Sequence, residues 1–294
     1  MALLNKNYLK SLIAVGSIKD DKFACDSTSF LVGFIVQNSD DPTQRLYRTF
    51  LVTNRHVFDG RQKVWLRLNT DDGKIKTFEQ NLYFPNGDSQ WLAHPDPEVD
   101  LALLIVSPDV LKQNNIQPSF ISEEMFGYVD KFDEVGIAVG DDAYVIGFPM
   151  GIAGEEQNHP CVKAALISRI DDEIIKSKKA FIVDSSIFPG NSGGPVILKP
   201  TAISLSDTKA VAQPYLLGVI SAYLPYMYTL YTHQTNPPTP ISITRENSGL
   251  SFCVPINFVK EIYDKWLEKQ KPVEEPQKNV NPEDLGEEVK AKII

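Results

Sequence analysis

Short apolar stretches alternate with polar turns along most of the chain. Residues 29–36 (SFLVGFIV) and 48–53 (RTFLVT) are rich in β-branched and aromatic residues, and the polar stretch 37–42 separates them. Such runs predict a pair of strands. Residues 63–68 (KVWLRL) alternate apolar and polar positions, and residues 101–106 (LALLIV) have the length of a buried strand. Strands of this length with frequent turns are typical of an antiparallel barrel or sandwich.

A second series of short strands follows a more polar segment. Residues 107–133 are loosely patterned, so we expect the crossover between two β units there. Beyond it, strand-like runs punctuated by Gly and Pro occur at residues 142–148, 162–170, 180–183, 195–198 and 215–222. The pattern therefore predicts two β units in tandem.

Both ends of the chain have a different pattern. Residues 1–17 predict a lead-in turn and a first strand, and their apolar run is too short for a signal peptide. Residues 256–269 predict a helix that begins after Pro255, with an apolar face formed by Phe258, Val259, Ile262, Tyr263, Trp266 and Leu267. Residues 270–294 predict a flexible acidic tail.

Composition and charge limit the classes of function. The chain has 294 residues, of which 43% are hydrophobic and 23% charged, as in soluble globular proteins. A net charge of -9 argues against nucleic acid as a partner, and no apolar stretch is long enough to span a membrane. Cys25, Cys161 and Cys253 are far apart and cannot all pair, so we expect no disulfide framework and a reducing, cytoplasmic location.

Residues 185–195 (SSIFPGNSGGP) concentrate the candidate chemistry. Glycines on both sides of Ser192 allow a sharp loop that presents a hydroxyl and outward-pointing N–H groups. Acyl transfer needs a nucleophilic oxygen and donors for the developing oxyanion, here the N–H groups of Gly190 and Ser192. The alternative is an ordinary Gly-rich turn between two strands.

Two further residues suit the same chemistry. His56 lies just after the predicted strand 48–53, and Asp100 immediately precedes the strand 101–106. A serine hydroxyl becomes a good nucleophile when an imidazole takes its proton, and a carboxylate then orients and stabilises that imidazole. The chain order His, Asp, Ser is one of the known orders of such a triad.

These motifs resemble those of the chymotrypsin-fold (trypsin-like) serine proteases, and most closely the HtrA-type protease domain. The similar segments are TNRHV around His56, DLALL from Asp100 and PGNSGGP around Ser192, with weaker likeness at 139–149 and 249–255. The resemblance covers residues 30–266. It implies two six-stranded antiparallel β-barrels, with His56 and Asp100 on the first (residues 1–120) and Ser192 on the second (121–255).

The resemblance also implies an activity. A serine endopeptidase would use Ser192 as nucleophile, His56 as general base and acid, Asp100 as its orienter and the N–H groups of Gly190 and Ser192 as oxyanion hole, with no cofactor and a polypeptide as substrate. The family's C-terminal PDZ domain is not expected, because the residues after Lys269 are few and polar. Two alternatives are a pseudoprotease that binds or scaffolds polypeptides and an esterase with the same triad.

Asn191 departs from the secreted branch, in which an aspartate before the serine pairs with the N-terminal amine. With Asn191 no such ion pair forms, so we expect the loop 187–192 to be only partly populated in its active form. A protein activator, a bound peptide or self-association would then raise activity. The Tyr-rich segment that begins at Tyr223 is the candidate sensor.

The resemblance places the substrate pocket at Ser186, Tyr223 and Leu250. None of the three is acidic, and the two larger side chains would make a shallow apolar site. We therefore expect cleavage after small or medium aliphatic residues. A shift of two residues would instead bring the carboxylate of Asp184 to the pocket floor, and the preference would turn to Lys and Arg.

Other features favour less specific interpretations. Residues 223–247 predict a long loop whose tyrosines either cover a sheet edge or form an aromatic wall over a peptide. His94 and His233 are expected to be solvated. His159 and Cys161 flank a proline, but two ligands do not make a zinc site, so no metal is expected.

Overall fold

The computed structural model describes residues 4–41, 44–116, 119–201, 208–232, 234, 237 and 239–270. Residues Met1–Ile262 form one compact unit and Tyr263–Ile294 a second. The predicted all-β fold, with two tandem β units followed by a C-terminal helix, is confirmed. The second unit is the expected six-stranded barrel, whereas the first is an eight-stranded sheet and not a six-stranded barrel. The predictions for His233 and for the tail beyond Gln270 lie outside the described residues.

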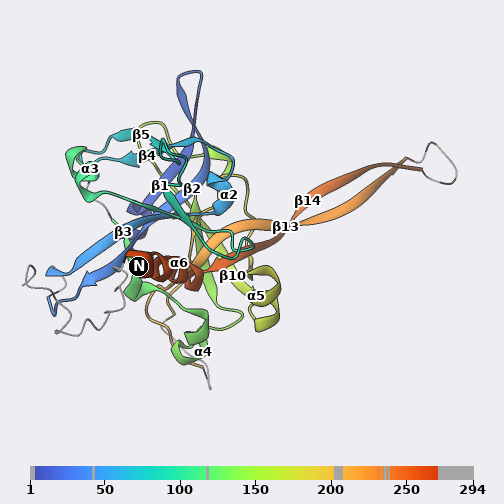
Figure 1. The fold of residues 1–294 in the computed structure, drawn as a ribbon. Helices are drawn as coiled ribbons and strands as arrows, with labels where there is room; N and C mark the ends of the chain where they lie inside the picture. Colours follow the sequence, from blue (N-terminus) through green and yellow to red (C-terminus); the bar gives the residue numbers. More distant parts are fainter. Residues whose placement is uncertain are drawn as a thin grey trace, which may run out of the picture. The chain divides into compact units, whose positions relative to one another are not determined.

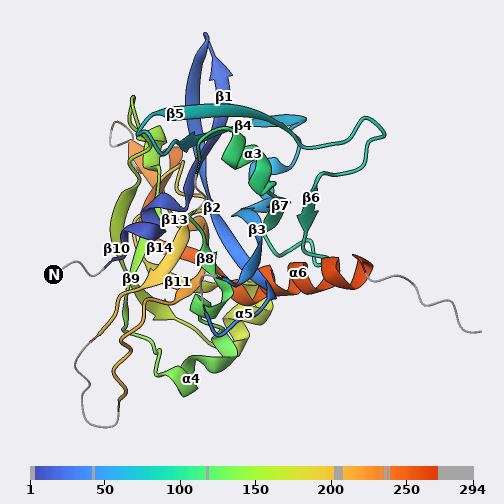
Figure 2. The ribbon, with the colours of Figure 1, turned by 90° about the vertical axis from the view of Figure 1, so that its left-hand side faces the viewer.

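The first sheet contains eight strands and has the pairing order β5-β4-β1-β2-β3-β7-β6, with β8 beside β2. All neighbours are antiparallel except β2 and β8, and in the described part of the chain the sheet forms an open half-barrel. The β1–β2 hairpin projects from it (Figures 1 and 2). The strands are β1 (Leu12–Lys19), β2 (Lys22–Gln37), β3 (Leu46–Thr53), β4 (Lys63–Asn69), β5 (Ile75–Asn81), β6 (Trp91–Ala93), β7 (Ala102–Ile105) and β8 (Ile121–Ser122).

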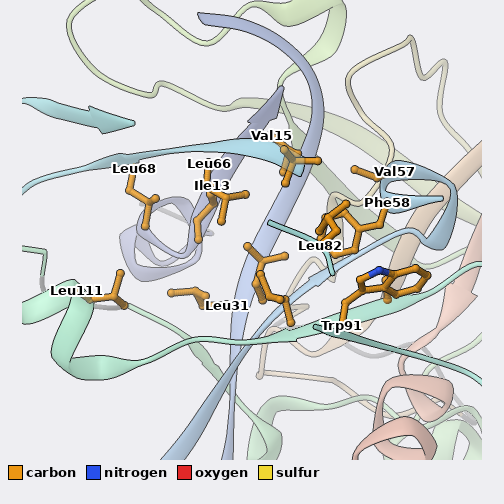
Figure 3. Close-up of a cluster of buried hydrophobic side chains, with 14 of the residues drawn as sticks. Ile13, Val15, Leu31, Val57, Phe58, Leu66, Leu68, Leu82, Trp91 and Leu111 are labelled. Atoms are coloured by element: carbon orange, nitrogen blue, oxygen red, sulfur yellow. The ribbon is translucent and has the colours of Figure 1, made fainter. Parts of the chain in front are cut away.

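One face of this sheet carries a buried hydrophobic core. The alternation predicted for β4 directs Val64, Leu66 and Leu68 to the same side, where they join side chains of β1 and β2. Figure 3 shows Leu66 and Leu68 gathered with Ile13 and Leu31 in this core. Burying each such side chain stabilises the fold by roughly 1.5–3 kcal/mol.

The connections contain short helices. Residues 6–10, predicted as part of a turn, form a helix because the Asn5 side chain accepts a hydrogen bond from the backbone N–H of Asn7 and caps it. The short helices are α1 (Lys6–Lys10), α2 (Arg55–Phe58), α3 (Pro108–Gln113), α4 (Phe132–Val135), α5 (Asp172–Lys178) and the 3-10 turns η2 (Glu123–Met125), η3 (Val129–Lys131) and η4 (Pro149–Gly151).

The second sheet is a closed barrel in the order β10-β11-β14-β13-β12-β9. Its interior is filled by residues such as Val145, Val183 and Leu217. The predicted strands of this half are present with ends shifted by one residue at most, except that the strand predicted at 215–222 extends to Thr232. The strands are β9 (Asp142–Gly147), β10 (Cys161–Arg169), β11 (Phe181–Asp184), β12 (Pro195–Leu198), β13 (Leu216–Thr232) and β14 (Thr239–Pro255).

The long loop predicted at residues 223–247 is wrong. β13 and β14 continue past the barrel as a two-stranded hairpin, with pairs such as Tyr226 with Glu246 (Figure 1). Cross-strand pairing outweighs the Pro- and Thr-rich composition that suggested a loop. The rings of Tyr226 and Tyr228 stack at 6.0 Å on this hairpin, whereas Tyr223 packs against the barrel core.

The predicted C-terminal helix is α6 (Ile256–Gln270), whose Val259 and Ile262 are buried. His94, expected to be solvated, is 7% exposed. Its Nε2 lies 3.0 Å from Glu261 Oε2, its Nδ1 accepts from the N–H of Asp96, and its ring meets that of Phe258 edge-on at 5.3 Å. The solvated prediction is wrong because α6 supplies partners that are remote in sequence.

Candidate active site

His56 and Asp100 are held together by two neighbouring strands. β3 pairs with β7 so that Thr53 lies opposite Ala102, which brings the residues just beyond these strand ends side by side. Asp100 Oδ1 accepts the backbone N–H of His56 at 3.0 Å, and Asp100 Oδ2 lies 2.7 Å from His56 Nδ1. The carboxylate therefore fixes the imidazole and leaves Nε2 to face a reacting group.

The environment keeps Asp100 ionised. Burial by itself raises the pKa of this carboxyl, but the hydrogen bond and charge of His56, the hydroxyl of Ser221 and the His56 N–H together hold the pKa below its ordinary value. An ionised carboxylate at this place stabilises an imidazolium that forms during proton transfer.

Ser221 links Asp100 to the predicted nucleophile. Its hydroxyl donates to Asp100 Oδ2 at 2.5 Å, and its carbonyl accepts the hydrogen of Ser192 Oγ at 3.0 Å. Within the described residues, the Ser192 hydroxyl makes this bond and none to His56. Sequence reasoning missed Ser221, although a polar residue directly after the apolar run 216–220 is a signal for it.

Thr28 of β2 braces the loop that carries Ser192. Its N–H donates to the carbonyl of Ser192 at 2.9 Å, and its hydroxyl donates to the carbonyl of Gly190 at 2.6 Å. The hydroxyl also accepts the N–H of Phe148, and the Thr28 carbonyl accepts the hydroxyl of Thr53. A residue of the first sheet thus fixes the loop 185–192 of the second sheet, which we call the nucleophile loop because it carries the predicted nucleophile Ser192.

The rest of this loop is anchored equally closely. Every carbonyl oxygen from Ser185 to Ser192 accepts a hydrogen bond, so the backbone conformation is fixed residue by residue. Besides Thr28, the donors are Ser251 Oγ to Ser185, Lys163 Nζ to Ser186, Asn247 Nδ2 to Ile187, and the N–H groups of Asn191 to Phe188, Met150 to Pro189 and Gly194 to Asn191.

The anchoring orients the predicted oxyanion donors. The carbonyl of Pro189 accepts the Met150 N–H at 2.6 Å, and in a trans peptide the following N–H, that of Gly190, points the opposite way. Gly190 has a φ of 99°, and a Cβ there would collide with the Phe148 carbonyl. In the described part of the chain, the N–H groups of Gly190 and Ser192 have no acceptor.

Asn191 braces the loop with an amide. It is fully buried, and its Oδ1 accepts the N–H of Phe188 at 3.0 Å. Its Nδ2 has no hydrogen-bond acceptor among the residues that the structure describes. In the secreted branch of the resembled family, an aspartate is expected at this position. Here the uncharged Asn191 side chain holds the loop through a hydrogen bond to a residue three positions away.

The predicted pocket residues come from neighbouring segments. Ser186 follows β11, whose Asp184 pairs with Leu250, and Tyr223 pairs with Ser251. A Cβ at Gly249 would lie 3.8 Å from both Ser186 Oγ and Asp184 Oδ1. The hydroxyl and the carboxylate therefore face the same region beside β14.

The described residues contain neither a disulfide nor a metal-binding cluster. All three cysteines are free thiols, and burial raises the pKa of Cys25 to about 12 and that of Cys253 well above its ordinary value. No group of three or more His, Cys, Asp and Glu residues within the described ranges could hold a metal ion. No described helix combines the length and hydrophobicity that crossing a membrane requires.

The sheets, the His–Asp pair and the anchored serine loop define a protein of the chymotrypsin-like class. A family model of the trypsin-like peptidase domain matches residues 32–200, which is more than half of the chain. The chain belongs to this family, and the resemblance to trypsin-like serine proteases is confirmed. The comparison with curated proteins found no significant match.

Two solved structures are similar to this chain. One is the apo MamO protease domain from Magnetospirillum magneticum, with a TM-score of 0.44 and 13% identity over 86% of this chain and 95% of that one. The other is the HtrA-type protease AlgW with a decapeptide, with a TM-score of 0.46 and 18% identity over 91% of this chain and 68% of that one.

Proposed function

We propose that this chain is a serine endopeptidase that cleaves polypeptides through an acyl-enzyme. The observation that carries the proposal is the double hydrogen bond of Asp100 to the N–H and Nδ1 of His56. It leaves Nε2 as the one ring nitrogen available to act as a base.

In the proposed reaction, His56 takes the proton of Ser192 Oγ while that oxygen attacks the substrate carbonyl. The N–H groups of Gly190 and Ser192 stabilise the oxyanion, and protonated His56 then gives its proton to the leaving amine. Water hydrolyses the acyl-enzyme by the same proton transfers in reverse order. No cofactor takes part.

The test is turnover and labelling by a fluorophosphonate. Ser192→Ala and His56→Ala should each lower kcat by several orders of magnitude, and the double variant should lose little more, because the residues act as a unit. Ser168→Ala is the control, since among the described residues its hydroxyl binds only the nearby Leu166 carbonyl. Retained peptide hydrolysis in Ser192→Ala contradicts the proposal.

A second function is a polypeptide-binding pseudoprotease. The bond from Ser192 Oγ to the Ser221 carbonyl favours it, because a nucleophile in this rotamer must rotate about χ1 before it meets His56. Binding of peptides without labelling of Ser192 or turnover would support this second function. Turnover of esters without turnover of peptides would instead indicate an esterase.

For specificity, we propose cleavage after small or medium aliphatic residues, with a pocket formed by Ser186, Tyr223 and Leu250. A missing or extra methylene there changes kcat/KM by roughly 10- to 200-fold. Asp184 is the competing determinant because it faces the same region. A peptide library cut mainly after Lys or Arg, with this preference lost in Asp184→Asn, would overturn the assignment.

We also propose that the population of the active form of the loop 187–192 rises when a polypeptide, a protein activator or a second copy of the chain binds. A purified monomer with no lag and no response to added polypeptide would contradict this regulation.

For location, we propose a reducing compartment such as the cytoplasm, which the free thiols support.

A further inference from the structure

A largely buried arginine, Arg67, lines a cavity near the segments that brace the loop carrying Ser192. Alternation along β4 places Arg67 on the face opposite the hydrophobic core, where solvent is expected. Residues 153–158 cover it, and Arg67 is only 7% exposed. Its guanidinium also stacks over the ring of Phe23 at 4.8 Å.

Only some of the N–H donors of Arg67 have a hydrogen-bond acceptor among the described residues. Nε donates to Asn158 Oδ1 at 2.8 Å and Nη2 donates to the Gly154 carbonyl at 2.8 Å. A guanidinium has five N–H groups, so most of its donors, including both on Nη1, remain without an acceptor among the described residues. Burial lowers the pKa of Arg67, but an arginine stays protonated at neutral pH.

No carboxylate neutralises this charge in the described part of the chain. The nearest thiol does not do so either, because burial raises the pKa of Cys25 to about 12 and keeps it protonated. Asp21 and Glu155 lie on the cavity wall but form no ion pair with Arg67. A buried charge without a counter-charge is costly, so the site is suited to an anion from outside the chain.

Arg67 lines an open cavity of about 720 Å³ that also includes Cys25 and Gly151. These two residues belong to the segments that brace the nucleophile loop. Three residues after Cys25, Thr28 binds the Ser192 carbonyl, and Met150, directly before Gly151, binds that of Pro189. The cavity therefore adjoins the loop on the side of β2 and η4.

The predicted acyl pocket lies on the other side, on β13, β14 and the segment after β11. For a substrate whose acyl part runs along β13, we take the leaving-group part to run over β2 and residue 151, toward the cavity that Arg67 lines. At about 3.3 Å per residue, Cys25 is roughly 10 Å along the strand from Thr28, which an extended peptide covers with about three residues.

We propose that Arg67 binds a carboxylate on the leaving-group side of the substrate, about three or four residues beyond the scissile bond. The group is an Asp or Glu side chain or the free C-terminus of the peptide, since a planar guanidinium matches a carboxylate with two parallel hydrogen bonds. Asp21 and Glu155 at the cavity wall repel a polyanion more strongly than a single carboxylate, so the single carboxylate is favoured. This inference rests on the proposed peptidase function.

The test compares matched peptides that differ only at the third and fourth leaving-group positions, with Glu in one and Gln in the other. A second pair ends there in a free carboxylate or an amide. The wild type should favour the carboxylate member of at least one pair by about 10-fold in kcat/KM, which corresponds to about 1.4 kcal/mol. The pair that responds identifies the source of the carboxylate.

Variants separate recognition from a structural role. In Arg67→Gln the preference should fall to about 1, whereas a purely structural Arg67 would lower both members of a pair equally. Arg169→Gln, which removes an exposed arginine paired with Asp171 on the second barrel, should keep the preference. Asn158→Ala removes the hydrogen bond to Arg67 Nε but retains the guanidinium, so this variant too should keep a preference for the carboxylate.

A binding measurement does not depend on turnover. Full-length Ser192→Ala should bind a fluorescent leaving-group peptide with Glu about 10-fold more tightly than the same peptide with Gln, and Arg67→Gln in that background should abolish the difference. If turnover is absent but this difference remains, the proposed function fails and the site stands. Equal affinity for both peptides, a preference that survives Arg67→Gln, or a stronger preference for a phosphopeptide would overturn the site.

Discussion

The hydroxyl of Ser221 lies 2.5 Å from Oδ2 of Asp100, and this oxygen also binds His56 Nδ1. Ser221 therefore shares the task of holding the carboxylate, while its carbonyl holds the Ser192 hydroxyl. A single residue contacts both ends of the proposed triad.

Ser221→Ala should lower kcat by about 10- to 100-fold, because a hydrogen bond to a charged group contributes about 1.5–3 kcal/mol. The remaining bonds to His56 keep the carboxylate in place, so KM should change little. Steady-state kinetics on one good substrate measures both, with Ser168→Ala as control. A kcat equal to that of the wild type would show that His56 alone suffices to orient Asp100.

Lys163 and Asn247 should act as positioning residues for the loop 185–192, which carries Ser192 and the proposed oxyanion donors. Asn247 Nδ2 donates to the Ile187 carbonyl at 2.6 Å, and Lys163 Nζ binds the Ser186 carbonyl and lies 4.8 Å from the centre of the Phe188 ring. Removing either donor leaves a loop carbonyl without its partner and lets the loop leave the active form.

Asn247→Ala and Lys163→Met should each lower kcat by about 5-fold and slow fluorophosphonate labelling of Ser192 in parallel. Lys176→Met, on the exposed face of α5, is the matched control. An added peptide that prefers the ordered loop should restore part of the labelling rate. Unchanged labelling in both variants would mean that the other donors suffice.

Asn191→Asp should destabilise the protein in a pH-dependent way. No ion pair with a cation is formed at this fully buried position among the residues that the structure describes, so the pKa of a carboxylate there should rise above its unfolded value. The loss of stability is then present at neutral pH and shrinks as the pH falls toward the unfolded pKa, by up to about 1.4 kcal/mol per pH unit.

Denaturant unfolding of Asn191→Asp at pH 5 and 7 measures this change. Asn38→Asp makes the same chemical change at an exposed position and should show no such dependence. A deficit of equal size at both pH values would show that the carboxylate finds water or a donor in the loop.

The ionised state of Asp100 should make the protein sensitive to acid. Its pKa is lower in the folded than in the unfolded state, so its contribution to stability is present above about pH 4 and is lost as the pH falls through the folded pKa. In Asp100→Asn, the curve of unfolding free energy against pH should be flatter below about pH 4. Parallel curves for the two proteins would contradict this prediction.

The cysteines should be insensitive to reductant and slow to alkylate. Desolvation raises the thiol pKa of the half-buried Cys25 and of the buried Cys253, so little thiolate is present at pH 8. Activity and Tm should be equal with and without strong reductant, and mass spectrometry should find these two thiols largely unmodified after brief iodoacetamide treatment. A drop in Tm on reduction would reveal a disulfide.

The sequence predicts the parts of the site whose signal is local. His56 and Asp100 each lie next to the end of a strand-like run, and glycines surround Ser192, so both the elements and the chemistry can be read from a few residues. The β13–β14 hairpin was missed because its prolines and threonines resemble those of a loop, while its stability depends on pairing between two strands.

Partners that are remote in sequence are beyond such reasoning. His94 is buried because Phe258 and Glu261 reach it from α6, and Arg67 is buried because residues 153–158 cover the outer face of β4. In both cases the local sequence suggests an exposed residue. Thr28 and Asn247 likewise have no feature that marks them, since their roles arise from the carbonyl groups that the fold brings to them.

The bond between Thr28 and Gly190 joins positions 162 residues apart. During synthesis the first sheet leaves the ribosome early, but the loop that it must brace follows much later, and domains generally fold as they emerge. The second half alone could close its barrel and still lack the support of Thr28 for the loop. The loop conformation proposed for Ser192 therefore depends on both halves of the chain, and a fragment that lacks the first sheet should lack the proposed activity.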